Sequence, residues 1–290
     1  MNIIIFLLVF CIVLFLYIHI YYHFKTNDDL EILEIENISK ERLEEICDLR
    51  QPLVMKIDKN IFDKFYINNL LENYSTFDIK IRNIKNLDDN SEIFLPLSLK
   101  DASKLILEDK NSEYISENNN EFLNETSVIK MISENDSFFR PYMLSNIDYD
   151  YIFGSKNSHT PLRYELNYRN YFLLLEGKVR IKLTPPKNEK YLYCNKDFDN
   201  FEFRSPLNVW DIQEEYKNDF SKMKFLEVDL EPGNLIYIPA YWWHSIKFLD
   251  ENSSMLSFKY RTYMNNVAIL PQIILKMMQK QNIKHKIIEN

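Results

Sequence analysis

The sequence predicts a mainly β domain with flanking helices, carried behind one N-terminal transmembrane helix. Three observations support this fold class. Short segments that alternate between apolar and polar residues follow one another from Pro161 onward, with turn residues between them, which is typical of an antiparallel barrel. The segment from Asn2 to Phe24 contains no Asp, Glu, Lys or Arg. Only three glycines occur in 290 residues, so long flexible linkers and glycine-rich phosphate loops are nearly excluded.

Residues 1–25 are predicted to be an uncleaved membrane anchor. About 20 apolar residues in a helix span a hydrocarbon core of about 30 Å, and residues 3–20 are almost wholly apolar. A signal peptide would need a basic start and small residues at a cleavage site, and neither is present; a buried core helix is the other alternative. Lys25 follows the segment and no Lys or Arg precedes it. The positive-inside rule therefore predicts a single-pass membrane protein whose soluble domain is cytosolic.

Charge and cysteine content restrict the function further. The net charge is −8, so we expect no nucleic-acid partner, because phosphate neutralisation needs clustered Lys and Arg. The three cysteines, Cys11, Cys47 and Cys194, are widely spaced and form no CxxC pair. This pattern indicates neither a disulfide framework nor a zinc site, and it favours a reducing compartment.

The chain after the anchor divides into three parts. Residues 26–50 are an acidic linker and a short helix capped by Ser39, residues 51–265 are the β domain, and residues 266–290 are an amphipathic helix. Strands are expected where apolar residues recur with the period of a strand: residues 51–57, 77–82, 163–175, 178–183, 225–230 and 255–263. Helices are expected over residues 61–73 and 99–107, and a polar loop over residues 117–121.

Residues 230–246, LEPGNLIYIPAYWWHSI, organise the predicted domain. Pro232 and Gly233 form a tight turn, and a short β-branched strand then ends at Pro239. Beyond it, His244 follows two tryptophans and a tyrosine. A strand that brings one imidazole into a wall of aromatic rings is how a β-barrel presents a metal ligand or a buried polar group.

This stretch resembles the C-terminal ligand strand of JmjC-type cupin-like proteins, the Fe(II)/2-oxoglutarate protein hydroxylases. Their pattern is T-P-x-H-x-D, then an Asn, a turn Gly, a Lys, Pro-Pro and a distal His. Here the matching residues are Thr160 to Glu165 (TPLRYE), Asn170, Gly177, Pro185-Pro186 and His244. The resemblance runs from residue 51 to residue 263 and implies a double-stranded β-helix, the cupin barrel. The composition is similar to that of membrane-tethered members encoded by large DNA viruses and some protists.

Three departures fall on the positions that the resemblance makes functional. Arg163 stands at the first histidine position, and a guanidinium stays protonated and has no lone pair for a metal. Glu165 replaces the aspartate, and Val179 stands where most relatives carry the lysine that binds 2-oxoglutarate. The neighbouring Lys178 and Arg180 have the wrong parity and should point outward.

We therefore expect Arg163, Glu165 and His244 to form a metal-free polar cluster, in which Arg163 and Glu165 neutralise each other inside the barrel. No cofactor is expected in this interpretation. In the alternative interpretation, Glu165 and His244 ligate Fe(II) beside 2-oxoglutarate. The residues that would then bind the co-substrate are Thr160, Asn170 and Lys259.

Three assignments stay open at this point. His159 would supply the missing imidazole for a metal set with Glu165 and His244, although Pro161 disfavours that geometry. His244 fits equally well as a core histidine that is hydrogen-bonded under the tryptophans. Lys259 and Arg261 either anchor an acidic ligand or form a solvated strand face.

The resemblance and its departures together predict a membrane-anchored, non-catalytic binding or scaffold protein with an unidentified protein partner. The alternative is an active Fe(II)/2-oxoglutarate-dependent protein hydroxylase with non-standard ligands. The C-terminal helix leaves a homodimer open, because relatives such as the asparaginyl hydroxylase of hypoxia-inducible factor dimerise through terminal helices.

Overall fold

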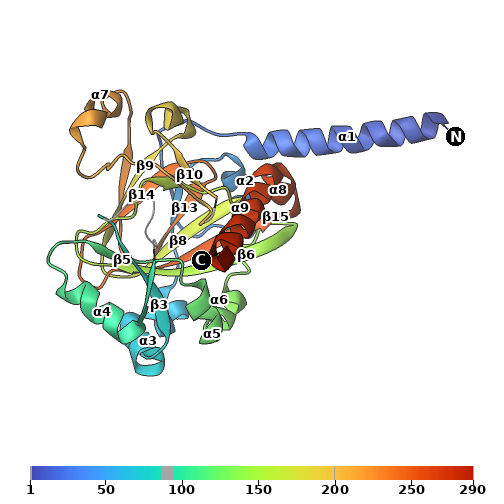
Figure 1. Ribbon diagram of the computed structural model, residues 1–290. Helices are drawn as coiled ribbons and strands as arrows, with labels where there is room; N and C mark the ends of the chain where they lie inside the picture. Colours follow the sequence, from blue (N-terminus) through green and yellow to red (C-terminus); the bar gives the residue numbers. More distant parts are fainter. Residues whose placement is uncertain (1, 86–93, 199, 290) are drawn as a thin grey trace.

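The computed structural model describes residues 2–85, 94–198 and 200–289. A helix, α1 (Asn2–Phe24), projects from a compact body of strands and helices (Figure 1). Its segment Ile3–Phe24 is 22 residues long and apolar enough to cross a membrane, and the rest of the protein buries none of its most apolar stretch. The expected N-terminal apolar helix is therefore present.

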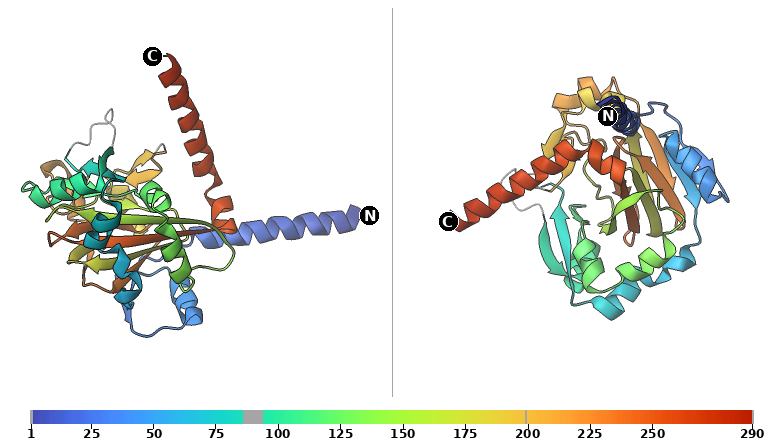
Figure 2. Two further views of the ribbon diagram at one scale, coloured as in Figure 1. Left: turned by 90° about the horizontal axis from the view of Figure 1, so that it is seen from below. Right: turned by 90° about the vertical axis from the view of Figure 1, so that its right-hand side faces the viewer.

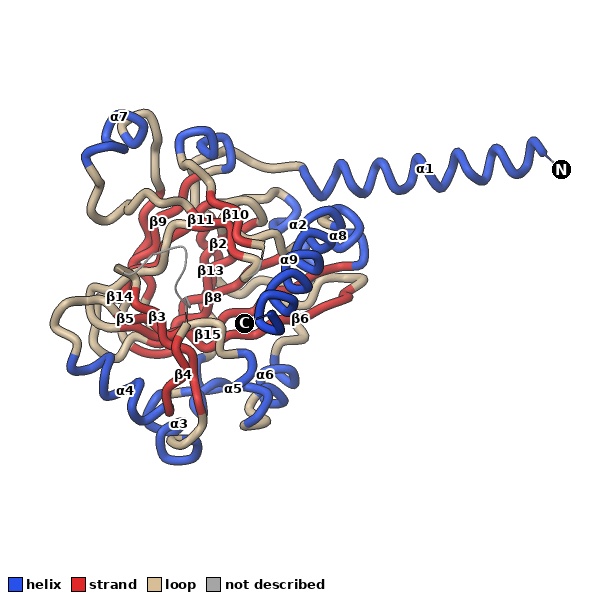
Figure 3. The backbone as a smooth tube through the Cα atoms, in the orientation of Figure 1, coloured by secondary structure: helices blue, strands red, loops and turns tan. Residues whose placement is uncertain are grey.

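Two sheets form the barrel, and its strands lie in the middle of the molecule with helices around them (Figure 3). The nine described strands of the larger sheet lie in the order β1-β2-β13-β8-β15-β6-β5-β3-β4. Their bounds are β1 (Leu33–Ile35), β2 (Leu53–Lys56), β3 (Asp78–Asn83), β4 (Leu95–Ser98), β5 (Tyr114–Ser116), β6 (Leu144–Gly154), β8 (Arg169–Glu176), β13 (Asn234–Pro239) and β15 (Ser254–Thr262). The six described strands of the smaller sheet lie in the order β10-β11-β7-β14-β9-β12. They are β7 (Arg163–Tyr164), β9 (Val179–Thr184), β10 (Asn195–Asp197), β11 (Glu202–Arg204), β12 (Leu226–Leu230) and β14 (Trp243–Phe248).

Helices cover the outer face of the larger sheet and extend the chain at both ends. The α-helices after α1 are α2 (Lys40–Asp48), α3 (Ile67–Tyr74), α4 (Leu99–Glu108), α5 (Asn120–Glu125), α6 (Ile129–Asn135), α7 (Lys217–Phe220), α8 (Tyr263–Ala268) and α9 (Leu270–Glu289). The described residues also form short 3-10 helices, η1 (Lys59–Phe65), η2 (Pro186–Tyr191) and η3 (Glu214–Tyr216). In the views of Figure 2, α9 leaves the domain near the base of α1 and runs crosswise to it.

Side chains alternate along the strands, so the buried core has one part inside the barrel and one part outside each of the two sheets. Inside the barrel, apolar side chains from both sheets pack together, among them Phe172, Ile181, Ile236 and Ile246. Outside the larger sheet, aromatic side chains such as Tyr171 pack against helices α2 to α6. Burying apolar area on both faces of the larger sheet supplies the main driving force for this fold. The expected mainly β, cupin-like fold is confirmed.

Three local expectations differ from the structure. The expected strand over residues 163–175 is two strands in different sheets, β7 and β8, because the chain crosses between the sheets at residues 165–168. The expected helix over residues 61–73 is divided into η1 and α3, because Tyr66 has an extended backbone (ψ 140°) between them. The expected polar loop over residues 117–121 contains the buried Glu117 and leads into α5.

Candidate functional site

Strands β7 and β14 place the two most informative side chains opposite each other inside the barrel. Arg163 and His244 are direct partners in the antiparallel pairing of these strands. Their neighbours Tyr164 and Trp243 point the other way and pack together outside the smaller sheet. The period of two along each strand therefore turns both Arg163 and His244 inward.

Arg163 is held by two carboxylates that are distant in the sequence. Its Nη2 lies 2.6 Å from Glu117 Oε2, and its Nη1 lies 3.2 Å from Glu202 Oε1. Arg82 contacts the same two residues, with its Nη1 2.9 Å from each carboxylate. We call Arg82, Glu117, Arg163 and Glu202 the buried ion network, because each of these side chains is less than one-tenth exposed.

The buried ion network fixes the charges of its members. Burial alone would raise the pKa of the Glu117 carboxyl, but the guanidinium groups of Arg163 and Arg82 outweigh burial and lower this pKa to about 2. Burial would lower the pKa of Arg163, and the carboxylates of Glu117 and Glu202 raise it above its ordinary value. Arg163 is thus a permanent cation in the barrel, as the sequence indicated.

Glu165 pairs with a different cation from the one that we expected. Lys259 Nζ on β15 lies 2.9 Å from Glu165 Oε1, and both side chains are largely buried. Burial would raise the pKa of Glu165, but Lys259 and then Arg163 hold it below its ordinary value. The expected neutralisation of Glu165 by Arg163 is only part of what the structure shows: each residue has a nearer partner, and Arg163 is the second cation, after Lys259, that acts on Glu165.

His244 is buried and neutral beside these charges. Its Nδ1 lies 3.3 Å from the carbonyl oxygen of Trp242, and its Nε2 is buried with no hydrogen-bond partner among the described residues. Burial, and then the cation of Arg163, lower the pKa of His244 to about 4, and Glu165 opposes them by less. Arg163, Glu165 and His244 therefore act on one another electrostatically without direct hydrogen bonds.

The residues proposed for co-substrate binding make hydrogen bonds within the protein. Thr160 Oγ1 accepts a hydrogen bond from the backbone nitrogen of Ile246 at 2.9 Å. Asn170 Nδ2 donates to the carbonyl oxygen of Ile238 at 3.2 Å, and Lys259 is paired with Glu165. The position of the missing lysine, Val179, lies in the apolar interior, whereas Arg180 points outward and pairs with Asp229, as the alternation predicted.

The donor set does not fit the iron centre that the resemblance implies. His159 does not complete a metal set, because it pairs with the strand at Lys247 and its Nδ1 lies near its neighbour's carbonyl oxygen. Across residues 2–85, 94–198 and 200–289, no group of three His, Cys, Asp or Glu side chains is placed to hold a metal ion. Two cations, Arg163 and Lys259, stand beside the one carboxylate and the one imidazole that remain.

A small polar cavity of about 100 Å³ lies at this end of the barrel. Its lining includes Arg163, Glu165, Glu202, Lys259 and Arg261. Burial lowers the pKa of Arg261 by more than the carboxylates of Asp148 and Glu165 raise it. Sequence reasoning missed Glu117 and Glu202, since neither lies near a recognised motif; the only available signal was that a buried arginine requires an acidic partner.

Comparison with known proteins agrees with this fold. The family model described as "Cupin-like domain" matches residues 62–266, which is more than half of the chain. HSPB1-associated protein 1 of Rattus norvegicus is 29% identical over 98 residues, covering 33% of this chain and 20% of that protein. JmjC domain-containing protein D of Dictyostelium discoideum is 28% identical over 110 residues (38% and 24%).

Arginine-specific demethylase JMJ20 of Arabidopsis thaliana is 29% identical over 133 residues, which are 43% of this chain and 27% of that protein. These matches thus cover only a fifth to about a quarter of the relatives' own lengths. Residues 62–266, which the family model matches, include both strands that carry the site, β7 and β14. The chain belongs to the cupin-like domain family, with relatives among JmjC-domain proteins.

Proposed function

We propose that this protein is a membrane-anchored cupin-like protein that has lost iron chemistry and acts as a non-catalytic binding or scaffold module. The observation that carries the proposal is the position of Arg163, which is buried, paired with Glu117 and Glu202, and directly opposite His244. A facial site for Fe(II) needs two imidazoles and a carboxylate with open positions beside them. A guanidinium at one ligand position repels a dication and donates no electron pair.

The other retained donors support the same proposal. The Glu165 carboxylate is compensated by Lys259 at 2.9 Å, so a metal ion would have to displace an existing buried ion pair. Removing one partner of such a pair costs about 3–5 kcal/mol. The Glu165–Lys259 pair and the buried ion network together therefore replace a metal ion in compensating the carboxylates at this end of the barrel.

The proposal includes α1 as a single-pass anchor with the domain on the cytosolic side. The length and hydropathy of Ile3–Phe24 support the membrane anchor. The position of Lys25 directly after this segment supports the orientation. With a net charge of −8, the partner is a protein rather than a nucleic acid. The abundance of Asn, Ile and Lys over Ala and Gly in the sequence supports a member of the kind found in large DNA viruses.

One observation favours the alternative, an active Fe(II)/2-oxoglutarate-dependent hydroxylase. His244 Nε2 is buried and has no hydrogen-bond partner in the part of the chain that the structure describes, and a neutral imidazole has a lone pair for a metal. In this alternative, Glu165 and His244 are the metal ligands and Lys259 turns toward the co-substrate.

Restoring the family residues tests whether Arg163 occupies a former metal-ligand position, on which the proposed loss of iron chemistry rests. We expect the double variant Arg163→His with Val179→Lys, in the full chain held in detergent micelles, to bind Mn(II) as a substitute for Fe(II) at least about tenfold more tightly than the wild type. The matched control is Arg163→Leu with Val179→Lys, which removes the cation without adding an imidazole. No gain over this control, with both variants folded by circular dichroism, would contradict the assignment of position 163 to the metal site.

A further inference from the structure

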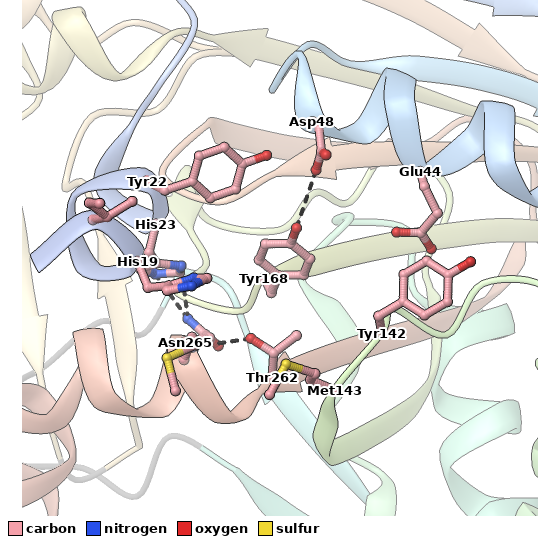
Figure 4. Close-up of a pocket in the computed structure, with 12 residues that line it drawn as sticks. His19, Tyr22, His23, Glu44, Asp48, Tyr142, Met143, Tyr168, Thr262 and Asn265 are labelled. Carbon is pink, nitrogen blue, oxygen red and sulfur yellow. Dashed lines mark hydrogen bonds between the residues drawn. The ribbon is translucent and has the colours of Figure 1, made fainter. Parts of the chain in front are cut away.

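Helix α8 holds the last turn of α1 against the domain. His23, near the end of α1, is 3% exposed, and Asn265 Nδ2 on α8 donates a hydrogen bond to its Nε2 at 2.9 Å, as Figure 4 shows. The same amide group donates to the carbonyl oxygen of Leu166, between β7 and β8, at 3.1 Å. Because these groups are buried and hydrogen-bonded to one another, α1 and α8 keep a fixed relative direction.

Helix α8 and the loop before β6 lie level with the end of the apolar segment of α1. Met264 on α8 and Tyr142 before β6 line one cavity together with Tyr22 of α1. The apolar segment Ile3–Phe24 is 22 residues long, and about 20 residues span a hydrocarbon core. With α1 as the membrane anchor, this part of the domain therefore lies at the membrane interface.

Helix α9, which follows α8 directly, has one side on the domain and exposed apolar side chains elsewhere. Ile273 packs against the core outside the smaller sheet, and Lys276 Nζ lies 4.6 Å from the centre of the Phe201 ring, so this side of α9 faces the domain. Exposed apolar side chains recur at i, i+4, i+7 and i+8 on another side of the helix. They are Leu270, Ile274, Met277 and Met278, which are 49%, 45%, 61% and 58% exposed.

The exposed side of α9 turns the same way as the projecting part of α1. In Figure 2, α9 begins beside the base of α1 and runs crosswise to it, with the strands on one side and the projecting part of α1 on the other. Since Ile273 and Lys276 face the domain, the side of α9 away from the domain faces the direction in which α1 projects. An amphipathic helix that lies crosswise to a transmembrane helix at its end lies in the plane of the membrane interface.

The exposed apolar side chains continue from α9 to the base of α1. The backbone nitrogen of Tyr263, at the start of α8, donates to the carbonyl oxygen of Met143 at 3.1 Å, so the loop before β6 lies against this helix. Tyr142, Met143 and Tyr263 are 67%, 60% and 59% exposed, and tyrosines are enriched at membrane interfaces. We call these three side chains and the four exposed ones of α9 the apolar face.

Charge favours a lipid surface over a second copy of the chain as the cover of the apolar face. Residues 263–290 contain four lysines and one acidic residue, Glu289, in a chain whose net charge is −8. Lysines beside an apolar stripe are typical of helices that lie on membranes, and the cytosolic leaflet carries anionic lipids that attract them. A second copy would bring an α9 segment of the same charge sign.

We propose that the apolar face lies on the lipid bilayer beside α1, so that α9 is an in-plane membrane helix. The proposal rests on α1 being the membrane anchor. Two membrane contacts, one along α1 and one along α9, then fix the orientation of the domain. Because Lys276 on the domain side of α9 also lines the small polar cavity, this orientation places that cavity next to the membrane surface.

Photocrosslinking of the full chain in lipid vesicles tests the proposal. The photoreactive residue p-benzoylphenylalanine takes the place of Met278, and the vesicles contain phosphatidylcholine with about one-fifth phosphatidylserine. The matched control has the same residue in place of Leu107, which is 53% exposed on α4, at the end of the domain away from α1 (Figure 1). We expect at least about fivefold more lipid adduct by mass spectrometry at position 278 than at position 107.

A third variant, with p-benzoylphenylalanine in place of Ile12 in α1, tests the anchor separately. Lipid adducts at position 12 without an excess at position 278 over position 107 would overturn only the in-plane helix. Adducts between two protein chains at position 278, in place of lipid adducts, would also overturn it and identify the apolar face as a dimer interface. No lipid adduct at position 12, together with release of the protein from vesicles at alkaline pH, would refute the anchor itself.

Discussion

Replacing Arg163 by leucine is the perturbation that most directly probes the buried ion network. Leucine fits an apolar interior but leaves the Glu117 carboxylate, which is fully buried, with Arg82 as the ion-pair partner that remains among the described residues. Removing one partner of a buried pair costs about 3–5 kcal/mol, since the other charge stays desolvated. We expect the lower part of this range because Arg82 is retained.

The pKa of Glu117 gives a second route to the same magnitude. Its ordinary value is 4.5 and the folded value is about 2, and each pKa unit corresponds to about 1.4 kcal/mol. The pairing with Arg163 and Arg82, less the opposing effect of burial, therefore contributes a net stabilisation of about 3 kcal/mol. Because the folded pKa lies below the unfolded one, this contribution is complete above about pH 4.5 and disappears as the pH falls toward 2. Without Arg163 the pKa of Glu117 rises, so the variant should lose stability at a higher pH than the wild type.

Urea unfolding of the full chain in detergent micelles, followed by tryptophan fluorescence, measures the effect. Arg163→Leu should lower the free energy of unfolding at pH 7 by about 3 kcal/mol, and the difference should shrink on acidification. The matched control is Arg180→Leu on β9, whose pair with Asp229 is substantially exposed and should be worth at most about 1 kcal/mol. A loss of less than about 1 kcal/mol for Arg163→Leu, equal to the control, would refute the reasoning.

Three further predictions concern the same barrel. The pKa of buried His244 is lowered to about 4, so as the pH falls the unfolded chain binds a proton at this residue before the folded protein does. The free energy of unfolding should therefore fall by about 2 kcal/mol between pH 6.5 and 5. His244→Leu should remove this part of the pH dependence of urea unfolding. Lys259→Met leaves Glu165 buried without its ion-pair partner and should lower the stability measured by thermal unfolding by about 3 kcal/mol. Adding Glu165→Gln to this variant should recover much of the loss. If the stability losses of the two single variants simply add in the double variant, the ion pair is contradicted. Gly177 has a φ of +73°, and a Cβ there would lie 2.6 Å from the Ser253 Cα, so Gly177→Ala should cost at least about 1 kcal/mol; an unchanged melting temperature would argue against this turn.

Much of the fold was predictable because local patterns and tertiary structure agree. The alternation over residues 178–183 places Val179 inside and Arg180 outside, and the turn before β13 has Gly233 with a φ of 91°. Strands with one buried face and one solvated face leave this period in the sequence. The same reasoning failed at residues 163–175, where every residue of β8 but the last is buried, because a strand buried on both faces shows no alternation that could mark where the chain changes sheets.

The site was predictable in its position but not in its pairing. The resemblance to JmjC-type proteins led us to expect Arg163 and His244 in one cluster, and the two residues are direct partners across β7 and β14. The partners of Arg163 are 46 and 39 residues away along the chain, on the loop after β5 and on β11. No spacing rule connects such positions, so the need for a counter-ion was predictable while its identity was not.

Metal stoichiometry of the unaltered full chain tests the central claim most directly. The protein, purified without oxygen in detergent micelles and equilibrated with Fe(II) and 2-oxoglutarate, should retain no stoichiometric iron by elemental analysis, because Arg163 and Lys259 hold positive charge beside Glu165 and His244. One equivalent of iron that disappears in both Glu165→Ala and His244→Ala would contradict the account and identify the protein as an iron enzyme with unusual ligands.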